Sequence, residues 1–189
     1  MSPMPEPTSP LAAEIARLSL LTGRFTLRSG RTSSYYIDKY LFSTDPNVLG
    51  QLASLFARRI VEIVLATPDD GPITRLAGAE LGGIPLVTAV GLETKTPTIF
   101  VRNARKGYGT SKQVEGRLDA GDRVILLEDV ATTGGQALEA VRLIAELGAQ
   151  TVAVICVIDR EEGARHAIES TGLRFESLFT RKDLGIGDD

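Results

Sequence analysis

The stretch that decides the fold is RVILLEDVATTGGQ, residues 123–136. Its apolar run, residues 124–127, is unbroken, which is typical of a central parallel strand covered by helices on both faces. Two acids follow, and then a Thr-Thr-Gly-Gly turn opens a predicted helix over residues 136–147. Backbone N–H groups and the helix dipole at such a turn favour a phosphate. The stretch therefore predicts a phosphate site at the carboxyl end of a parallel strand.

The two acids, Glu128 and Asp129, carry the same negative charge as a phosphate and so do not help to bind it. They therefore indicate a different role. Carboxylates accept hydrogen bonds, so an adjacent pair can take the 2- and 3-hydroxyls of a ribose whose 5-phosphate lies in the turn at residues 131–135. The alternative is an ordinary strand-to-helix loop with a solvated acid pair. A Walker A loop is excluded because the chain has no Gly-Lys-Ser/Thr, and a dinucleotide fingerprint fails because Lys112 stands at its third glycine position.

Apolar runs and amphipathic stretches alternate along the rest of the chain. Parallel strands are predicted at residues 73–77, 98–101, 124–127 and 152–158. Helices are predicted at residues 11–21, 46–66, 81–92, 136–147 and 161–170. Two short aromatic strands are predicted at residues 25–27 and 35–37. The alternation predicts an α/β fold with a parallel sheet, one domain over residues 11–189, and a proline-rich disordered tail at residues 1–10.

Composition excludes several classes of function. The 189 residues include 24 acidic and 21 basic side chains, so the chain lacks the overall positive field of a non-specific nucleic-acid binder. The one cysteine, Cys156, and the one histidine, His166, leave neither a disulfide nor a zinc-type site. We expect Cys156 to be buried in a strand and His166 to lie on the surface. No apolar run approaches the length of a membrane span, and we expect a cytoplasmic protein that binds neither membranes nor nucleic acid.

A basic segment lies between the second and third predicted parallel strands, at residues 102–116. It carries four cations, Arg102, Arg105, Lys106 and Lys112, and two of its glycines, Gly107 and Gly109, permit a hinge. A segment of this kind can close over a departing anion such as diphosphate and exclude water. The alternative is a solvated surface loop.

The motif VILLEDVATTGG resembles the diphosphoribosyl-binding motif of type I phosphoribosyltransferases. Four further segments resemble the orotate phosphoribosyltransferase family in particular, in order and at similar spacings: FTLRSGRTSSYYID at 25–38, AGAELGGIPL at 77–86, VRNARKGYGTSKQVEG at 101–116 and Asp159-Arg160. The resemblance implies a five-stranded parallel core flanked by helices, with a small hood formed by about residues 20–40 and C-terminal residues.

The resemblance also implies a reaction. The 5-phosphoribosyl group of 5-phospho-α-D-ribose 1-diphosphate, called ribosyl diphosphate below, passes to orotate and gives orotidine 5-phosphate and diphosphate, a step of pyrimidine biosynthesis. Mg²⁺ is implied as cofactor, held mainly by substrate and water with no direct protein ligand. A homodimer is implied, in which the segment 102–116 of each subunit reaches its partner's site. Two alternatives remain open: transfer to another base, and a regulator that binds ribosyl diphosphate without chemistry.

By the same resemblance, the catalytic residues are Arg102, Lys106, Glu128 and Asp129. The residues implied to bind ribosyl diphosphate are Arg102, Lys106, Tyr108, Glu128, Asp129, Val130, Ala131, Thr132, Thr133, Gly134, Gly135 and Gln136. Those implied to bind orotate are Arg28, Tyr36, Ile37, Thr132 and Arg160. The chain departs from the family at Asn103, where a second cation is common.

The residues themselves support part of this assignment. The planar guanidinium of Arg160 suits bidentate recognition of the orotate carboxylate. The alternative for Arg160 is an ion pair with Glu161 or Glu162. Because neighbouring side chains in a strand point to opposite faces, one of Tyr35 and Tyr36 is expected to pack in the core.

Overall fold

The computed structural model describes residues 6–26, 30, 32–67, 71–103 and 113–187. Its centre is a six-stranded sheet in the order β5-β4-β3-β6-β7-β8. The strands are β3 (Arg75–Ala79), β4 (Thr98–Val101), β5 (Val114–Glu115), β6 (Arg123–Ala131), β7 (Gln150–Asp159) and β8 (Arg174–Thr180). β5 runs antiparallel to β4, and the other five strands are parallel. The predicted α/β fold with a parallel sheet is confirmed.

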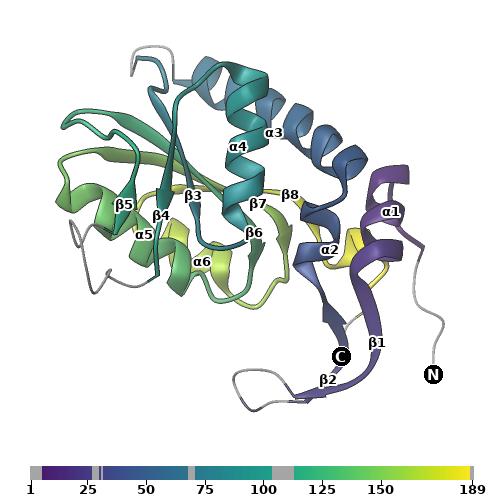
Figure 1. Ribbon diagram of the computed structural model, residues 1–189. Coiled ribbons are helices and arrows are strands. Elements are labelled where there is room, and N and C mark those ends of the chain that lie inside the picture. The colour runs from purple at the N-terminus through teal and green to yellow at the C-terminus, as the bar shows by residue number, and fades with distance from the viewer. Residues whose placement is uncertain (1–5, 27–29, 31, 68–70, 104–112, 188–189) are drawn as a thin grey trace.

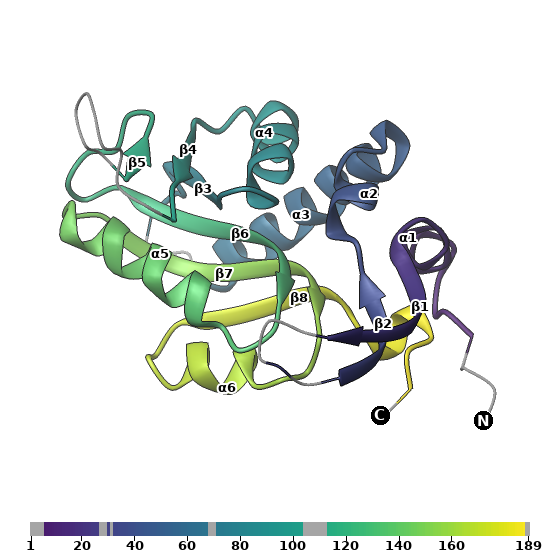
Figure 2. The same ribbon diagram turned by 60° about the horizontal axis from the view of Figure 1, so that its bottom comes forward.

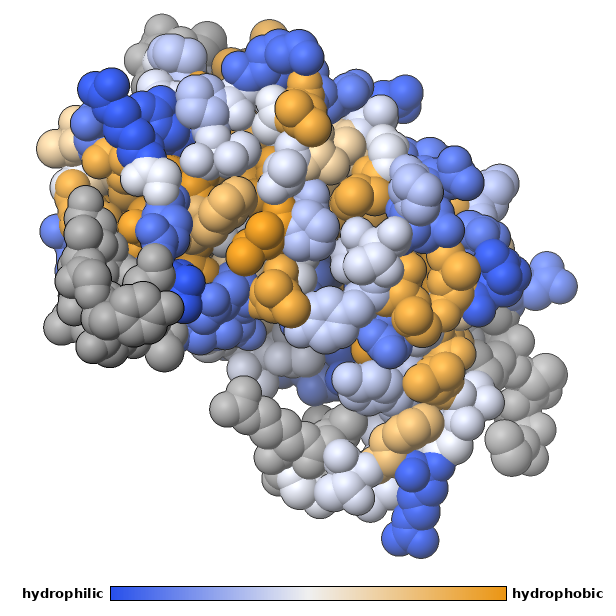
Figure 3. All heavy atoms as spheres, viewed as in Figure 1, coloured by the Kyte–Doolittle hydropathy of each residue, from blue (hydrophilic) through white to orange (hydrophobic). Residues whose placement is uncertain are grey.

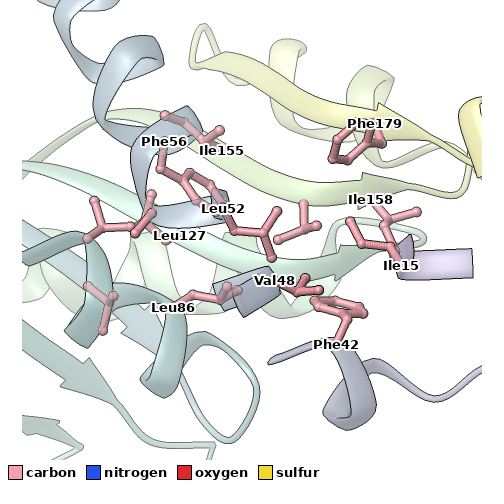
Figure 4. Close-up of a cluster of buried hydrophobic side chains, with 14 of the residues drawn as sticks. Ile15, Phe42, Val48, Leu52, Phe56, Leu86, Leu127, Ile155, Ile158 and Phe179 are labelled. Atoms are coloured by element: carbon pink, nitrogen blue, oxygen red, sulfur yellow. The ribbon is translucent and has the colours of Figure 1, made fainter. Parts of the chain in front are cut away.

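Helices cover both faces of the sheet, as the unbroken apolar strands require. The helices α3 (Pro46–Ala66) and α4 (Gly83–Thr94) lie on one face, and α5 (Gly135–Glu146) and α6 (Ala164–Glu169) lie on the other (Figure 1). Figure 4 shows Phe56 and Leu52 of α3 packed among the sheet residues Leu127 and Ile155. A separate apolar cluster lies under α5 and α6. None of the helices in the described ranges is long and apolar enough to span a membrane.

A hairpin stands apart from the main sheet. The N-terminal elements are α1 (Pro10–Ser19), β1 (Leu20–Thr26), β2 (Thr32–Ile37) and α2 (Lys39–Ser43). β1 and β2 pair antiparallel in a two-stranded sheet, from Leu20 opposite Ile37 to Thr26 opposite Thr32. Figure 2 shows this hairpin on the side of the molecule where β6 and β7 end. It therefore lies next to the edge at which parallel sheets bind ligands.

Some element boundaries differ from the prediction. The first helix ends at Ser19, because Leu20 and Leu21 enter β1 and pair with β2. β6 continues past its apolar run to Ala131, because its backbone goes on pairing with β7 as far as Asp159. The two acids therefore belong to the strand rather than to the loop after it. The sequence patterns missed α2, β5, β8 and the short 3₁₀ helix η2 (Lys182–Leu184).

The predicted N-terminal tail extends too far. α1 begins at Pro10, and the Ser9 hydroxyl caps it by accepting from the Ala12 N–H at 3.2 Å. Thr8 donates its backbone N–H to the carbonyl of Asp183 at 3.0 Å. Serine before proline at a helix start is a favoured cap that stabilises the first turn. Residues 8–10 are thus tied to the body of the protein, and residues 1–5 lie outside the described ranges.

Candidate active site

The predicted phosphate turn joins β6 to α5. Gly134 caps α5 with φ 79°, a left-handed conformation that suits glycine, and a Cβ there would lie 3.3 Å from the Cα of Ala164. The Ala131 carbonyl accepts from the Arg160 N–H and the Thr132 carbonyl accepts from the Ala164 N–H, both at 2.9 Å. These bonds fix the turn against the segment that follows β7.

A cavity of about 280 Å³ lies at this turn. Its lining is Glu128, Val130, Ala131, Thr132, Thr133, Gly134, Gly135, Gln136, Ala137, Val154 and Ile168. No described side chain caps the N-terminus of α5, so its first backbone N–H groups remain available to an anion. The structure thus brings together the predicted turn and Glu128 around one cavity of a size that suits a phosphate group.

The two acids leave opposite faces of β6, as strand geometry demands. Glu128 lines the cavity beside α5. Asp129 points toward α4 and α2, where its Oδ2 lies 2.8 Å from the ammonium nitrogen of Lys39. Its Oδ1 accepts from the Val130 N–H at 2.6 Å. The acids therefore do not form a side-by-side pair; a ligand lying across the end of β6 meets one from each face.

Burial changes the acidity of Glu128. Loss of hydration, reinforced by the neighbouring charge of Asp129 and opposed by the charge of Lys39, raises the pKa of this carboxyl from 4.5 to about 8. Its Oε1 is buried and has no hydrogen-bond partner among the described residues. At neutral pH, Glu128 is therefore mostly protonated, with an oxygen available to a ligand.

This perturbed pKa makes the stability of the protein depend on pH. Between pH 4.5 and about 8, the folded state keeps a proton on Glu128 that the unfolded chain has released, so the free energy of unfolding falls as pH rises through this window. The variant Glu128→Gln cannot release this proton. Across this window, we expect the free energy of unfolding of the wild type to fall by up to about 5 kcal/mol relative to that of the variant, at about 1.36 kcal/mol per pKa unit.

Chemical denaturation of both proteins at a series of pH values measures this difference. Glu93→Gln, the same change at an exposed position on α4, is the matched control and keeps the wild-type pH dependence. A Glu128→Gln curve parallel to that of the wild type would show that Glu128 titrates normally.

Arg160 directly follows β7 and contacts the hairpin. Its guanidinium donates to the hydroxyl of Tyr35 at 3.2 Å and pairs with Glu162 at 2.8 Å. The guanidinium carbon also lies 5.1 Å from the centre of the Tyr35 ring. The side chain of Arg160 is 11% exposed, and its buried Nε has no hydrogen-bond partner among the described residues. The ion pair with Glu162, one alternative for Arg160, is present, and the guanidinium is held in one orientation.

The other predicted orotate residues are placed as follows. Tyr35 is the tyrosine that packs in the core, whereas Tyr36 is 43% exposed and its ring contacts Phe25, with centres 5.7 Å apart. The side chain of Ile37 is buried in the core, so it can present only its backbone to a ligand. Thr132 lies in the turn that lines the cavity. Arg28 lies outside the described residues.

The base of the basic segment is anchored near the turn. The Asn103 backbone N–H donates to the Glu80 carboxylate at 2.7 Å, and its side-chain oxygen accepts from Gln136 at 3.0 Å. Asn103, the departure from the family, therefore links the end of β4 to the start of α5. Arg102 lies next to it, 3.9 Å from Glu115 on β5. Lys106 and Tyr108 lie outside the described residues, as do Arg105 and Lys112.

Cys156 and His166 are not among the residues that line the cavity. Cys156 is fully buried in mid-strand, and burial raises the pKa of its thiol well above the ordinary value. His166 lies exposed on α6. Both predictions are confirmed. Within the described ranges, no group of three His, Cys, Asp or Glu residues is arranged to hold a metal ion.

Sequence reasoning missed three residues that shape the site. They are Lys39, which pairs with Asp129; Gly82, against which the Asp129 carboxylate packs; and Glu80, which anchors Asn103. A Cβ on Gly82 would lie 1.5 Å from the Asp129 Oδ2. The adjacent glycines 82 and 83 are the one local signal of such a close approach.

The fold and the turn define a phosphoribosyltransferase. The family model described as phosphoribosyl transferase domain matches residues 50–171. The chain is 46% identical to the orotate phosphoribosyltransferase of Natronomonas pharaonis, over 86% of this chain and 87% of that protein. This chain therefore belongs to the orotate phosphoribosyltransferase family, as the sequence resemblance implies.

Solved structures agree with this membership. The orotate phosphoribosyltransferase of Aeropyrum pernix superposes with a TM-score of 0.79 at 31% identity, covering 92% of this chain and 95% of that one. The Mycobacterium tuberculosis enzyme in complex with 5-phospho-α-D-ribosyl 1-diphosphate superposes with a TM-score of 0.72 at 32% identity, covering 93% and 97%.

Proposed function

We propose that this protein transfers the 5-phosphoribosyl group of ribosyl diphosphate to orotate, giving orotidine 5-phosphate and diphosphate. The observation that carries the proposal is the cavity at the start of α5, where an uncapped helix N-terminus, a glycine turn and Glu128 meet. The relatives of the chain, one of them solved with ribosyl diphosphate, support the same reaction.

In the proposed arrangement, the 5-phosphate accepts hydrogen bonds from the backbone of residues 131–135, and the ribose lies across the end of β6. Protonated Glu128 and the carboxylate of Asp129 then meet the ribose from opposite faces of the strand. The bond between the ribose C1 and the diphosphate oxygen breaks, a ring nitrogen of orotate forms the new bond to C1, and its proton is released. The charge of Asp129 stabilises the cationic sugar, and Arg102 and Lys106 receive the leaving diphosphate.

Magnesium is part of the proposal as an ion carried by the substrate. Bound to the diphosphate, it neutralises charge on the leaving group. Substrate oxygens and water supply most of its ligands. The free oxygen of Glu128 at the cavity suits a ribose hydroxyl or a water of that hydration shell.

Orotate is proposed to bind between the hairpin and Arg160. The Arg160→Ala variant loses the cation for the orotate carboxylate, so we expect the KM for orotate to rise about 10- to 100-fold, the effect of about 1.5–3 kcal/mol for a charged hydrogen bond. The KM for ribosyl diphosphate changes far less. Steady-state kinetics with each substrate varied in turn measures both values.

The matched control for this variant is Arg142→Ala, which removes an exposed arginine of α5 that pairs only with its own helix among the described residues. It keeps both KM values. Equal increases for the two substrates in Arg160→Ala would contradict the assignment of Arg160 to the base.

We also propose a cytoplasmic homodimer in which the segment 102–116 completes the partner's site. Apolar side chains gather over α4 and where α1, α2 and β1 meet on the face drawn in Figure 3. Leu21 of β1 and Leu41 of α2 are exposed. Such surface favours association. Mixing Lys106→Ala with Asp129→Asn is expected to restore about a quarter of wild-type activity, because half the dimers are mixed and each has one intact site.

Activity restored on mixing requires subunit exchange, which differently tagged subunits recovered in one dimer demonstrate. No recovery despite exchange would mean that each subunit uses its own segment, and a monomer in sedimentation would reject the assembly.

The transfer itself is tested by following orotate absorbance after addition of protein, ribosyl diphosphate and magnesium. We expect orotate to be consumed, with hypoxanthine and uracil unchanged in parallel reactions. Consumption of another base in place of orotate would reassign the substrate, and binding of ribosyl diphosphate with no base consumed would identify a regulator.

A further inference from the structure

Lys39 is a charged residue to which the proposed reaction assigns no role. Its ammonium nitrogen lies 2.8 Å from Oδ2 of Asp129, and its side chain is 31% exposed against 3% for that of Asp129. Burial alone would lower the pKa of Lys39, but the charge and hydrogen bonding of Asp129 raise it above its ordinary value. Lys39 therefore remains protonated beside Asp129 in the free protein.

The backbone that carries Lys39 is firmly placed. Lys39 opens α2 directly after β2, and the preceding Asp38 caps this helix by accepting from the Tyr40 N–H at 3.2 Å. The backbone N–H of Asp38 donates to the Ser19 carbonyl at 2.8 Å, which ties it to the end of α1. Lys39 thus projects from the hairpin region toward the end of β6.

Groups from three parts of the described structure lie against the Asp129 carboxylate. The Val130 N–H comes from its own strand, and Gly82 from the start of α4; Lys39 alone of these comes from the hairpin side and alone is charged. A buried carboxylate is stable as an anion only with a compensating charge and well-placed donors. Lys39 supplies that charge and also restricts the direction of the carboxylate.

We infer that Lys39 is a positioning residue for the transfer, which holds the carboxylate of Asp129 in place for the ribose and makes the hairpin a contributor to the ribosyl half of the site. The inference rests on the proposed function. It differs from a direct contact with substrate, because Lys39 acts through Asp129.

Two substitutions of Lys39 separate the effect of its charge from the effect of its side-chain size. Lys39→Met keeps the length of the side chain without its charge, and we expect kcat/KM for ribosyl diphosphate to fall about 100-fold, as when a reacting group is misplaced by about 1 Å. Lys39→Arg keeps the charge and restores most of the activity. Lys95→Met, the same change at the far end of α4, is the matched control and behaves as wild type.

A double-mutant cycle tests whether Lys39 acts through Asp129. Binding of ribosyl diphosphate is measured by titration calorimetry with magnesium and without orotate, so that no transfer occurs. We expect Lys39→Met to weaken binding in the wild-type background and to have little further effect in Asp129→Asn, because coupled residues are not additive. Additive losses, or a Lys39→Met protein that binds and reacts like Lys95→Met, would overturn the inference.

The same measurements separate the two proposals. If the wild type binds ribosyl diphosphate but does not consume orotate, the proposed reaction is wrong. The double-mutant cycle then still tests whether Lys39 acts through Asp129. If the wild type does not bind ribosyl diphosphate, both fail. Circular dichroism verifies folding, and if Lys39→Met unfolds, Lys39→Gln carries the same test with a donor but no charge.

Discussion

The Asp129→Asn protein is expected to fold and to lose about 100- to 1000-fold in kcat, the range seen when one preorganised electrostatic group is removed from an active site. The change keeps volume and removes the charge that faces the cationic sugar. It also releases Lys39 from its 2.8 Å ion pair, so the remaining side chains are held less firmly. Initial rates at saturating orotate and ribosyl diphosphate measure the loss.

Asp119→Asn is the matched control for this change. Asp119 is exposed and lies shortly before the start of β6, at the opposite end of this strand from Asp129. It is expected to keep the wild-type kcat. An Asp129→Asn protein that retains most of its rate would remove Asp129 from the catalytic groups.

Gly82→Ala is expected to lower kcat/KM about 100-fold, a loss typical of a catalytic group displaced by about 1 Å. The added Cβ would lie 1.5 Å from Oδ2 and 2.5 Å from Cγ of Asp129, so the carboxylate must leave its place. Gly82 has φ −72° and ψ −25°, which alanine adopts without strain. The loss therefore measures the position of Asp129 and not a distorted backbone.

Gly50→Ala, in the second turn of α3, is the matched control, because a Cβ there meets nothing within 4 Å. It is expected to keep full activity and to gain about 0.5–1 kcal/mol of stability, the helical preference of alanine over glycine. Thermal unfolding of both variants separates stability from function. Wild-type activity in Gly82→Ala would mean that the carboxylate tolerates displacement.

The sequence predicts those parts of the site whose structure is set by residues close together along the chain. The apolar run before Glu128 and the glycines of the turn are local signals, and the strand, turn and helix form where they indicate. The alternation of Tyr35 and Tyr36 likewise predicts that one ring is buried. The same alternation separates Glu128 from Asp129. The sequence nevertheless predicts an adjacent pair, because the apolar run that marks the strand ends before them.

The contacts that orient the site could not be predicted in this way. Lys39 meets Asp129, and Tyr35 meets Arg160, only because the hairpin folds over the end of the sheet. No periodicity links residues so far apart in sequence. The sequence does not predict β8 for another reason: it is an edge strand with a mixed pattern, and neither an apolar run nor strict alternation marks it.

The most direct test of the account is a crystal structure of the protein with ribosyl diphosphate and magnesium. We expect the 5-phosphate in the turn at residues 131–135, with backbone N–H groups of the first turn of α5 donating to it. The ribose is expected across the end of β6, between Glu128 and Asp129, with the Asp129 carboxylate still paired with Lys39. A phosphate bound away from this turn, or a ribose that contacts neither acid, would contradict the account.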